Sequence, residues 1–142
     1  FRLNTAHSKI LALVLAYEGP KDVLTGVAID TDKALAWQNA KEFHHFFPQA
    51  FLKAKGIAPG KASALANMVY LSSASNKLIT DRAPSEYLKQ LLDLHGNAAR
   101  GWLHTNLVDD AAIAAALKDD YDGFLTARAA AINSHTMKLA GW

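Results

Sequence analysis

The sequence predicts an α+β domain that is mainly helical and has a small pair of strands near its centre. Apolar residues recur at helical spacing near both ends of the chain, whereas short segments in the middle carry the aromatic and β-branched residues that strands favour. The chain has 142 residues, of which 51% are hydrophobic. This length supplies one core and is too short for two ordinary domains, so we expect a single domain over residues 1–142.

The N-terminal part of the chain is expected to form a core helix. Apolar residues recur at helical spacing over residues 5–18, and Thr5 or Ser8 can cap the start. Gly19 followed by Pro20 ends the pattern, because this pair does not continue a helix.

The middle of the chain alternates between short extended and short helical segments. The aromatic density of residues 42–48, closed by a proline, favours a strand, and a Pro-Gly pair at 59–60 favours a loop. Strands are expected at 26–29, 42–48 and 67–72, helical segments at 33–41, 49–55 and 74–79, and a loop at 57–64.

The last third is rich in alanine and is expected to be helical. Pro84 fits the first position of a helix that runs to about Leu94 and is stopped by Gly96. A helix near 109–118 and a longer one over 121–139 follow. The buried stripe of the longer helix is expected to contain Phe124, Leu125, Ala129 and Ile132.

Composition limits the classes of function. The chain lacks cysteine, which excludes disulfides, thiol catalysis and cysteine zinc knuckles. Its longest apolar run, Ile10 to Tyr17, is too short to cross a bilayer, and the first residues do not look like a secretion signal. We therefore expect a cytoplasmic protein without a membrane partner. Because the chain starts at Phe1, we also expect it to be a piece of a longer protein.

Charge is distributed unevenly along the chain. The net charge is only +2, but residues 41–90 carry seven Lys or Arg and three acidic residues, whereas the remainder carries eight bases and ten acids. The positive excess in the middle third would attract a polyanion such as DNA. The alternative interpretation is an ordinary solvated surface.

The segment with the most chemical information contains a histidine pair and two spaced asparagines. His44 and His45 precede Pro48, and Asn67 and Asn76 lie nine residues apart. Neutral imidazole can accept a proton near physiological pH, which suits a general base in phosphodiester hydrolysis. Taken singly, the histidines could be core residues and the asparagines a turn residue and a helix cap.

This segment resembles the HNH nuclease signature, in which a (D/E/H)-H-x-x-P element ends the first strand and an N-x8-N element spans the second strand and the following helix. The whole chain is similar to the C-terminal HNH domain of GmrSD-type restriction proteins, including the SspE proteins of phosphorothioate-based phage defence. The matching elements are T-G-x-x-I at 25–29, H-H-x-F-P at 44–48, N-x-x-x-L-S-x-x-x-N-x-x-I at 67–79, A-P-S-E-Y-L at 83–88 and Y-D-x-F-L-x-x-R at 121–128. The resemblance implies a mainly helical domain around a small ββα-metal (HNH) core.

The resemblance also implies a role for each residue of the motif. His45 takes the position of the general base. His44, in a position usually held by Asp or Glu, and Asn76 take the positions of the metal ligands. Asn67 belongs to the catalytic set as a support, because its amide would tie down the loop between the strands and so aim His45.

Histidine in place of a carboxylate affects both the metal and the geometry. Loss of a negative charge should weaken Mg²⁺ relative to Mn²⁺, Ni²⁺ or Zn²⁺, so Mg²⁺ or Mn²⁺ is expected first, with Ni²⁺ and Zn²⁺ as further candidates. Neighbouring residues of a regular strand point to opposite faces. His44 and His45 can therefore share a site only if the strand is distorted there, which Pro48 and the following turn make plausible.

The function implied is a metal-dependent endonuclease that nicks double-stranded DNA, as part of a prokaryotic restriction or phage-defence protein. An N-terminal nucleotide-hydrolysing sensor domain of the same protein is the implied partner. Lys41, Lys77 and Arg82 flank the motif and are candidates for DNA phosphate contacts.

Two alternatives stay open from the sequence. One is a catalytically degenerate ββα domain that binds DNA or another partner without cutting, and the other is a helical interaction module whose motif is coincidental. For Arg128, in the last matching element, we expect an ion pair with Asp122 or packing of its stem on the core.

Overall fold

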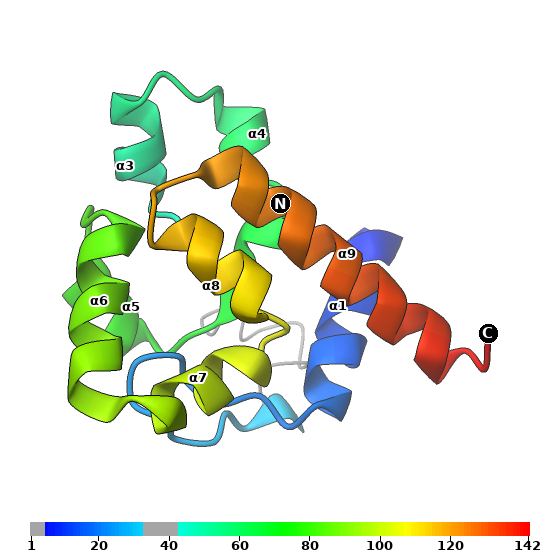
Figure 1. The fold of residues 1–142 in the computed structure, drawn as a ribbon. Helices are drawn as coiled ribbons and strands as arrows, with labels where there is room; N and C mark the ends of the chain where they lie inside the picture. Colours follow the sequence, from blue (N-terminus) through cyan, green and yellow to red (C-terminus); the bar gives the residue numbers. More distant parts are fainter. Residues whose placement is uncertain (1–4, 33–42) are drawn as a thin grey trace.

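The computed structural model describes residues 5–32 and 43–142 and has the mainly helical α+β architecture that the sequence predicts (Figure 1). The elements are the helices α1 (Ala6–Tyr17), α3 (Gln49–Ala54), α4 (Pro59–Ala62), α5 (Ser73–Ile79), α6 (Pro84–His95), α7 (Asn97–His104), α8 (Asp110–Ala116) and α9 (Tyr121–Leu139), the 3-10 turn η2 (Leu65–Asn67) and the strands β1 (Phe43–His45) and β2 (Met68–Tyr70). In the described part of the chain, no helix has both the length and the apolar character needed to span a bilayer.

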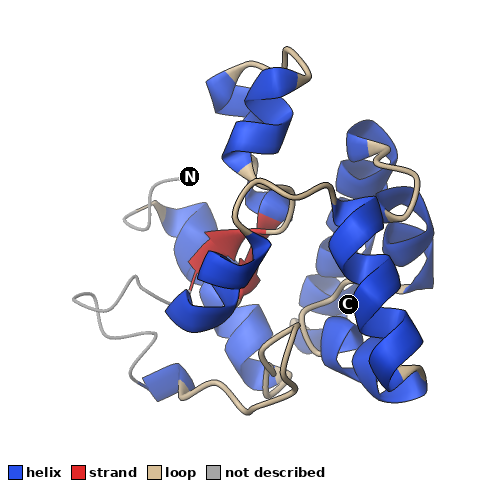
Figure 2. Cartoon of the chain, turned by 90° about the vertical axis from the view of Figure 1, so that its left-hand side faces the viewer, coloured by secondary structure: helices blue, strands red, loops and turns tan. Residues whose placement is uncertain are grey.

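The two strands form an antiparallel pair with helices on both sides (Figure 2). The register pairs Phe43 with Tyr70, His44 with Val69 and His45 with Met68. Directly opposite residues of such a pair share a face. Accordingly, Phe43, Met68 and Tyr70 pack in a small core cluster with α1, whereas Val69 belongs to the larger cluster on the other face.

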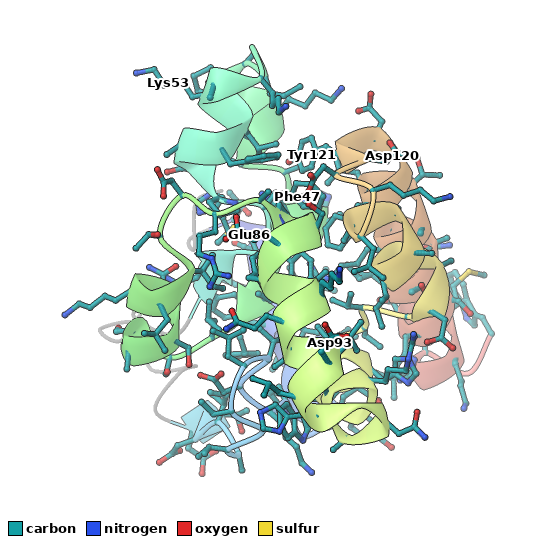
Figure 3. The ribbon with its side chains drawn as sticks, turned by 60° about the vertical axis from the view of Figure 1, so that its left-hand side comes forward. Phe47, Lys53, Glu86, Asp93, Asp120 and Tyr121 are labelled. Carbon is teal, nitrogen blue, oxygen red and sulfur yellow. The ribbon has the colours of Figure 1, made fainter. Side chains whose placement is uncertain are left out.

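The larger core cluster holds the end of β1 against the C-terminal helices. The Phe46 ring stacks on Phe124 of α9, with ring centroids 4.7 Å apart and planes 9° from parallel. The neighbouring ring of Phe47 lies 5.0 Å from Tyr121, at the start of the same helix (Figure 3). The Tyr87 hydroxyl of α6 donates to the Phe46 carbonyl at 2.6 Å. Full burial of each phenylalanine contributes about 1.5–3 kcal/mol, so the residues after the histidine pair are firmly held.

The predicted N-terminal helix is confirmed as α1. Thr5 is its N-cap, and the side chains of Thr5 and Ser8 each accept a hydrogen bond from the other residue's backbone, as in a capping box. Leu11 and Leu15 point into the small cluster, so this helix covers one face of the sheet.

Four expectations are corrected by the structure. Residues 26–29 form no strand, because only an isolated bridge between Lys21 and Ala28 is made. The expected loop at 57–64 contains the helical turn α4, since Pro59 suits the first position of a helix. Helix α7 was not expected, and Ala129 of α9 is exposed rather than buried. The helix expected at 33–41 lies outside the described residues.

Helices α3 and α4 form a small hairpin that projects from the body of the domain. It is inserted between β1 and β2, and in Figure 1 and Figure 2 its far end projects beyond the other helices, while α4 lies beside the start of α9. Its root therefore coincides with the ends of the two strands.

Candidate functional site

The Asn67 side chain closes the segment between the two strands. It is fully buried, and its Oδ1 accepts from the Phe47 backbone N–H at 2.8 Å. Its Nδ2 donates to the carbonyls of Phe47 at 3.1 Å and Ala62 at 3.0 Å. One amide thus joins the start and the end of the inserted hairpin, two residues beyond His45. This is the kind of contact that the sequence predicts for Asn67, and its contribution to catalysis stays a prediction.

The strand pairing is regular through the histidine pair. The Phe46 N–H donates to the Asn67 carbonyl at 2.8 Å, so the ladder continues one residue beyond His45. The distortion expected at the histidines is therefore wrong for this segment, because the chain leaves the ladder only at Phe47. On this register His44 shares a face with Val69, and His45 shares the opposite face with Met68. The two histidines are not brought to one face of the sheet.

His45 lies in a largely apolar setting. Its Nε2 is buried and has no hydrogen-bond partner within the described ranges. Burial, with a further contribution from the adjacent His44, lowers the pKa of His45 to about 4. The imidazole is therefore neutral at neutral pH and able to accept a proton, although a base of this pKa is weak.

Asn76 lies on the helix that follows the second strand. Helix α5 begins three residues after Tyr70, and its Ile79 packs in the same core cluster as Val69. Ser75 and Ile79 are buried, and Asn76, half-buried, flanks this inward face. His44 thus lies on the side of the sheet whose core cluster also contains Ile79 of α5, and His45 lies on the other side.

The N-terminus of α5 is held by a residue that the sequence analysis missed, Asp22. Its buried carboxylate accepts from the backbone N–H groups of Leu24 (2.9 Å), Thr25 (3.2 Å) and Ser72 (2.8 Å), and from the Ser75 hydroxyl (3.0 Å). Burial alone would raise the pKa of Asp22, but the hydrogen bonds from Ser72, Leu24 and Ser75 outweigh it and lower the pKa. An Asp two residues before Leu24, in a turn that continues Thr-Gly, is the signal that could have identified it.

A second buried network holds β2 from its outer side. The Arg128 guanidinium donates to the Ala66 carbonyl at 2.7 Å and to the Asn106 carbonyl at 3.0 and 3.3 Å. The Asn106 side chain in turn accepts from the Tyr70 N–H at 2.8 Å. The expected ion pair of Arg128 with Asp122 is wrong, whereas its burial in the core is confirmed. Asp122 pairs instead with Lys61 at 2.5 Å.

The three predicted phosphate contacts differ in their surroundings. Lys77 is exposed on α5, one residue from Asn76. Arg82 is half-buried and donates to Glu86 at 3.2 Å and to Gln90 at 2.9 Å, so its charge is partly compensated. Lys41 lies outside the described residues.

The two residues that the resemblance assigns to a metal, His44 and Asn76, are of types that bind divalent cations. Imidazole and amide oxygen are both ligands of borderline first-row metals. In residues 5–32 and 43–142 the Asn76 side chain makes no hydrogen bond that would compete with a cation. No group of three or more His, Cys, Asp or Glu that could hold a metal occurs in these ranges. The pair His44 and Asn76 includes one residue of these four types, so it is smaller than such a group.

Comparison with known proteins gives one short similarity. Over 56 residues the chain is 34% identical to the uncharacterized protein MJ0686 of Methanocaldococcus jannaschii. The match covers 39% of this chain, and the chain spans about a tenth of the length of that protein. No family model and no solved structure matches. The HNH resemblance therefore stays a prediction from the motif.

Proposed function

We propose that this chain is an HNH-type endonuclease domain that hydrolyses a phosphodiester of double-stranded DNA, leaving a nick. The observation that carries the proposal is the Asn67 amide, which ties both ends of the inter-strand segment at the position where the signature requires a support. The order of strand, strand and helix over β1, β2 and α5 agrees with a ββα core.

In the proposed mechanism each polar residue of the motif has one task. His45, neutral because of its burial, accepts the proton of the attacking water. Asn67 restrains the backbone two residues beyond it, and His44 and Asn76 would hold the cation. The chemistry that a bound divalent cation supplies is neutralisation of the charge that develops on the phosphate. Asp22 fixes the N-terminus of α5 and so the position of Asn76.

Catalysis in this scheme requires the His45 imidazole to reach the side of the sheet that carries His44. The regular register from Phe43 to His45 opposes this. It favours a second candidate function, a ββα domain that binds DNA without cutting it.

A nicking assay separates the two candidates. Supercoiled plasmid is incubated with the chain and Mg²⁺, Mn²⁺, Ni²⁺ or Zn²⁺, and open circles are measured on a gel. His45→Ala and Asn76→Ala should each abolish nicking and leave DNA binding intact. His104→Ala is the matched control, because that histidine is exposed and pairs with the exposed Asp110.

The nuclease proposal fails if the wild-type chain produces no open circles with any of the four metals, or if His45→Ala nicks at the wild-type rate. Retained plasmid binding in the first case would support the second candidate. Loss of nicking in the His104→Ala control would show that removing a histidine abolishes nicking by disturbing the fold and not by removing a catalytic group.

A further inference from the structure

The surface that stands out from the rest of the domain is the hairpin of α3 and α4. It occupies residues 48–64, between β1 and β2, and its far end projects beyond the other helices in two perpendicular views (Figures 1 and 2). Only Phe46 and Phe47 separate His45 from Pro48 at its root. Whatever this hairpin binds is therefore brought to the edge of the candidate site.

All charged side chains of the hairpin are basic. Residues 48–64 contain Lys53, Lys55 and Lys61 and no acidic residue, whereas the rest of the chain carries 12 basic and 13 acidic residues. Lys53 extends from α3 into solvent (Figure 3), and Lys55 is also exposed, with its Nζ 5.6 Å from the centroid of the Phe51 ring. The charge of the hairpin thus exceeds the net charge of the whole chain.

The root of the hairpin is rigidly attached. The Asn67 amide bonds to Phe47 and Ala62, and the Tyr121 hydroxyl donates to the Lys61 carbonyl at 2.7 Å. The Lys61 ammonium pairs with Asp122 of α9, so this lysine is partly compensated. Lys53 and Lys55 remain as cations of the hairpin held at a fixed place relative to β1.

We infer that the α3–α4 hairpin docks on the phosphate backbone of double-stranded DNA through Lys53 and Lys55. Two exposed cations in a segment that contains no acidic residue attract a polyanion, and a preorganised support lowers the ordering cost of binding. An anionic membrane is less suited, because peripheral membrane segments insert large apolar side chains. In the described ranges, no exposed large apolar residue lies on the hairpin. The inference deepens the proposed function, on which it rests for the choice of DNA. Lys53 and Lys55 are not among the phosphate contacts predicted from the sequence.

The test measures DNA binding without cleavage. Binding of a fluorescein-labelled DNA duplex to the chain is followed by anisotropy in EDTA, between about 50 and about 200 mM KCl. The double variant Lys53→Gln/Lys55→Gln should weaken binding. It should also reduce the slope of log K against log salt by about 2, since each phosphate contact contributes about 0.9. Lys89→Gln/Lys138→Gln is the matched control, with the same loss of charge on exposed lysines of α6 and α9.

The outcomes separate this inference from the nuclease proposal. An unchanged slope in the hairpin variant, or an equal reduction in the control, would overturn the inference even if the wild-type chain nicks plasmid. A reduced slope confined to the hairpin variant would support it even if no nicking occurs. The inference would also be overturned if binding to vesicles of anionic phospholipid depends on Lys53 and Lys55 and binding to DNA does not. Circular dichroism should give the wild-type melting curve for both variants, since the substituted side chains are exposed.

Discussion

Replacement of Asn67 by alanine tests the most specific structural feature of the site. The substitution removes the acceptor for the Phe47 N–H and the donor for the carbonyls of Phe47 and Ala62. All three partners lie where water has little access, because the Asn67 side chain is fully buried.

The expected loss follows from the three hydrogen bonds. Each contributes about 1 kcal/mol net, and backbone groups left buried without a partner add about 1–3 kcal/mol. The free energy of unfolding should therefore fall by about 4–6 kcal/mol, a large part of the stability of an ordinary domain. Asn67→Asp should lower the free energy of unfolding at least as much. It keeps the acceptor for the Phe47 N–H but places a carboxylate oxygen, which repels the two carbonyl oxygens, where the amide nitrogen donated.

Urea unfolding followed by far-UV circular dichroism, in buffer without divalent metal, measures this loss. The matched control is Asn76→Ala, which should change the free energy by less than about 1 kcal/mol, because alanine favours the helix interior. If Asn67→Ala unfolds within about 1 kcal/mol of the wild type, the amide does not hold the inter-strand segment as argued. A variant too unstable to purify agrees with the expectation, provided that Asn76→Ala folds.

Three further predictions concern stability and use the same unfolding assay. The lowered pKa of Asp22 stabilises the folded chain above pH ~4, and this stabilisation is lost as the pH falls through the folded-state pKa. Asp22→Asn should therefore reduce the fall in the free energy of unfolding at acid pH. An unchanged fall would contradict the stabilising role of the Asp22 carboxylate. Arg128→Lys should cost about 2–4 kcal/mol, because one ammonium cannot bridge the two carbonyls that the guanidinium joins, and a loss below about 1 kcal/mol would argue against it. Gly26→Ala should destabilise more than Gly19→Ala: both residues have positive φ, which costs about 1–2 kcal/mol, but only at Gly26 would a Cβ overlap Trp102. Equal losses would count against this packing argument.

The elements that sequence reasoning predicted are those with strong local signals. Thr5 caps α1, Pro84 begins α6 and Gly96 follows its end, as their conformational preferences require. Helix α4 was interpreted as a loop because Pro59-Gly60 is also typical of turns. Helix α7 was missed because the glycine that ends α6 at once becomes the N-cap of α7.

The supports of the candidate site were harder to predict, because they depend on contacts distant in sequence. Asp22 reaches Ser72 across 50 residues, and Arg128 reaches Ala66 across 62. No periodicity encodes such pairs. The side of the sheet on which each histidine lies was equally hard to predict, since it depends on the register of β1 against β2.

The bond from Asn106 to Tyr70 has a consequence for self-association. In this register the N–H groups of Met68 and Tyr70 point away from β1, toward the outer side of β2 that Asn106 and Arg128 cover. The first donates to the Leu65 carbonyl and the second to Asn106, so neither is offered to a strand of another molecule. A strand edge without such a cover is a common starting point for aggregation. Asn106→Ala should therefore remove part of this cover and favour intermolecular strand addition, seen as concentration-dependent light scattering that is expected to be absent from the wild-type chain.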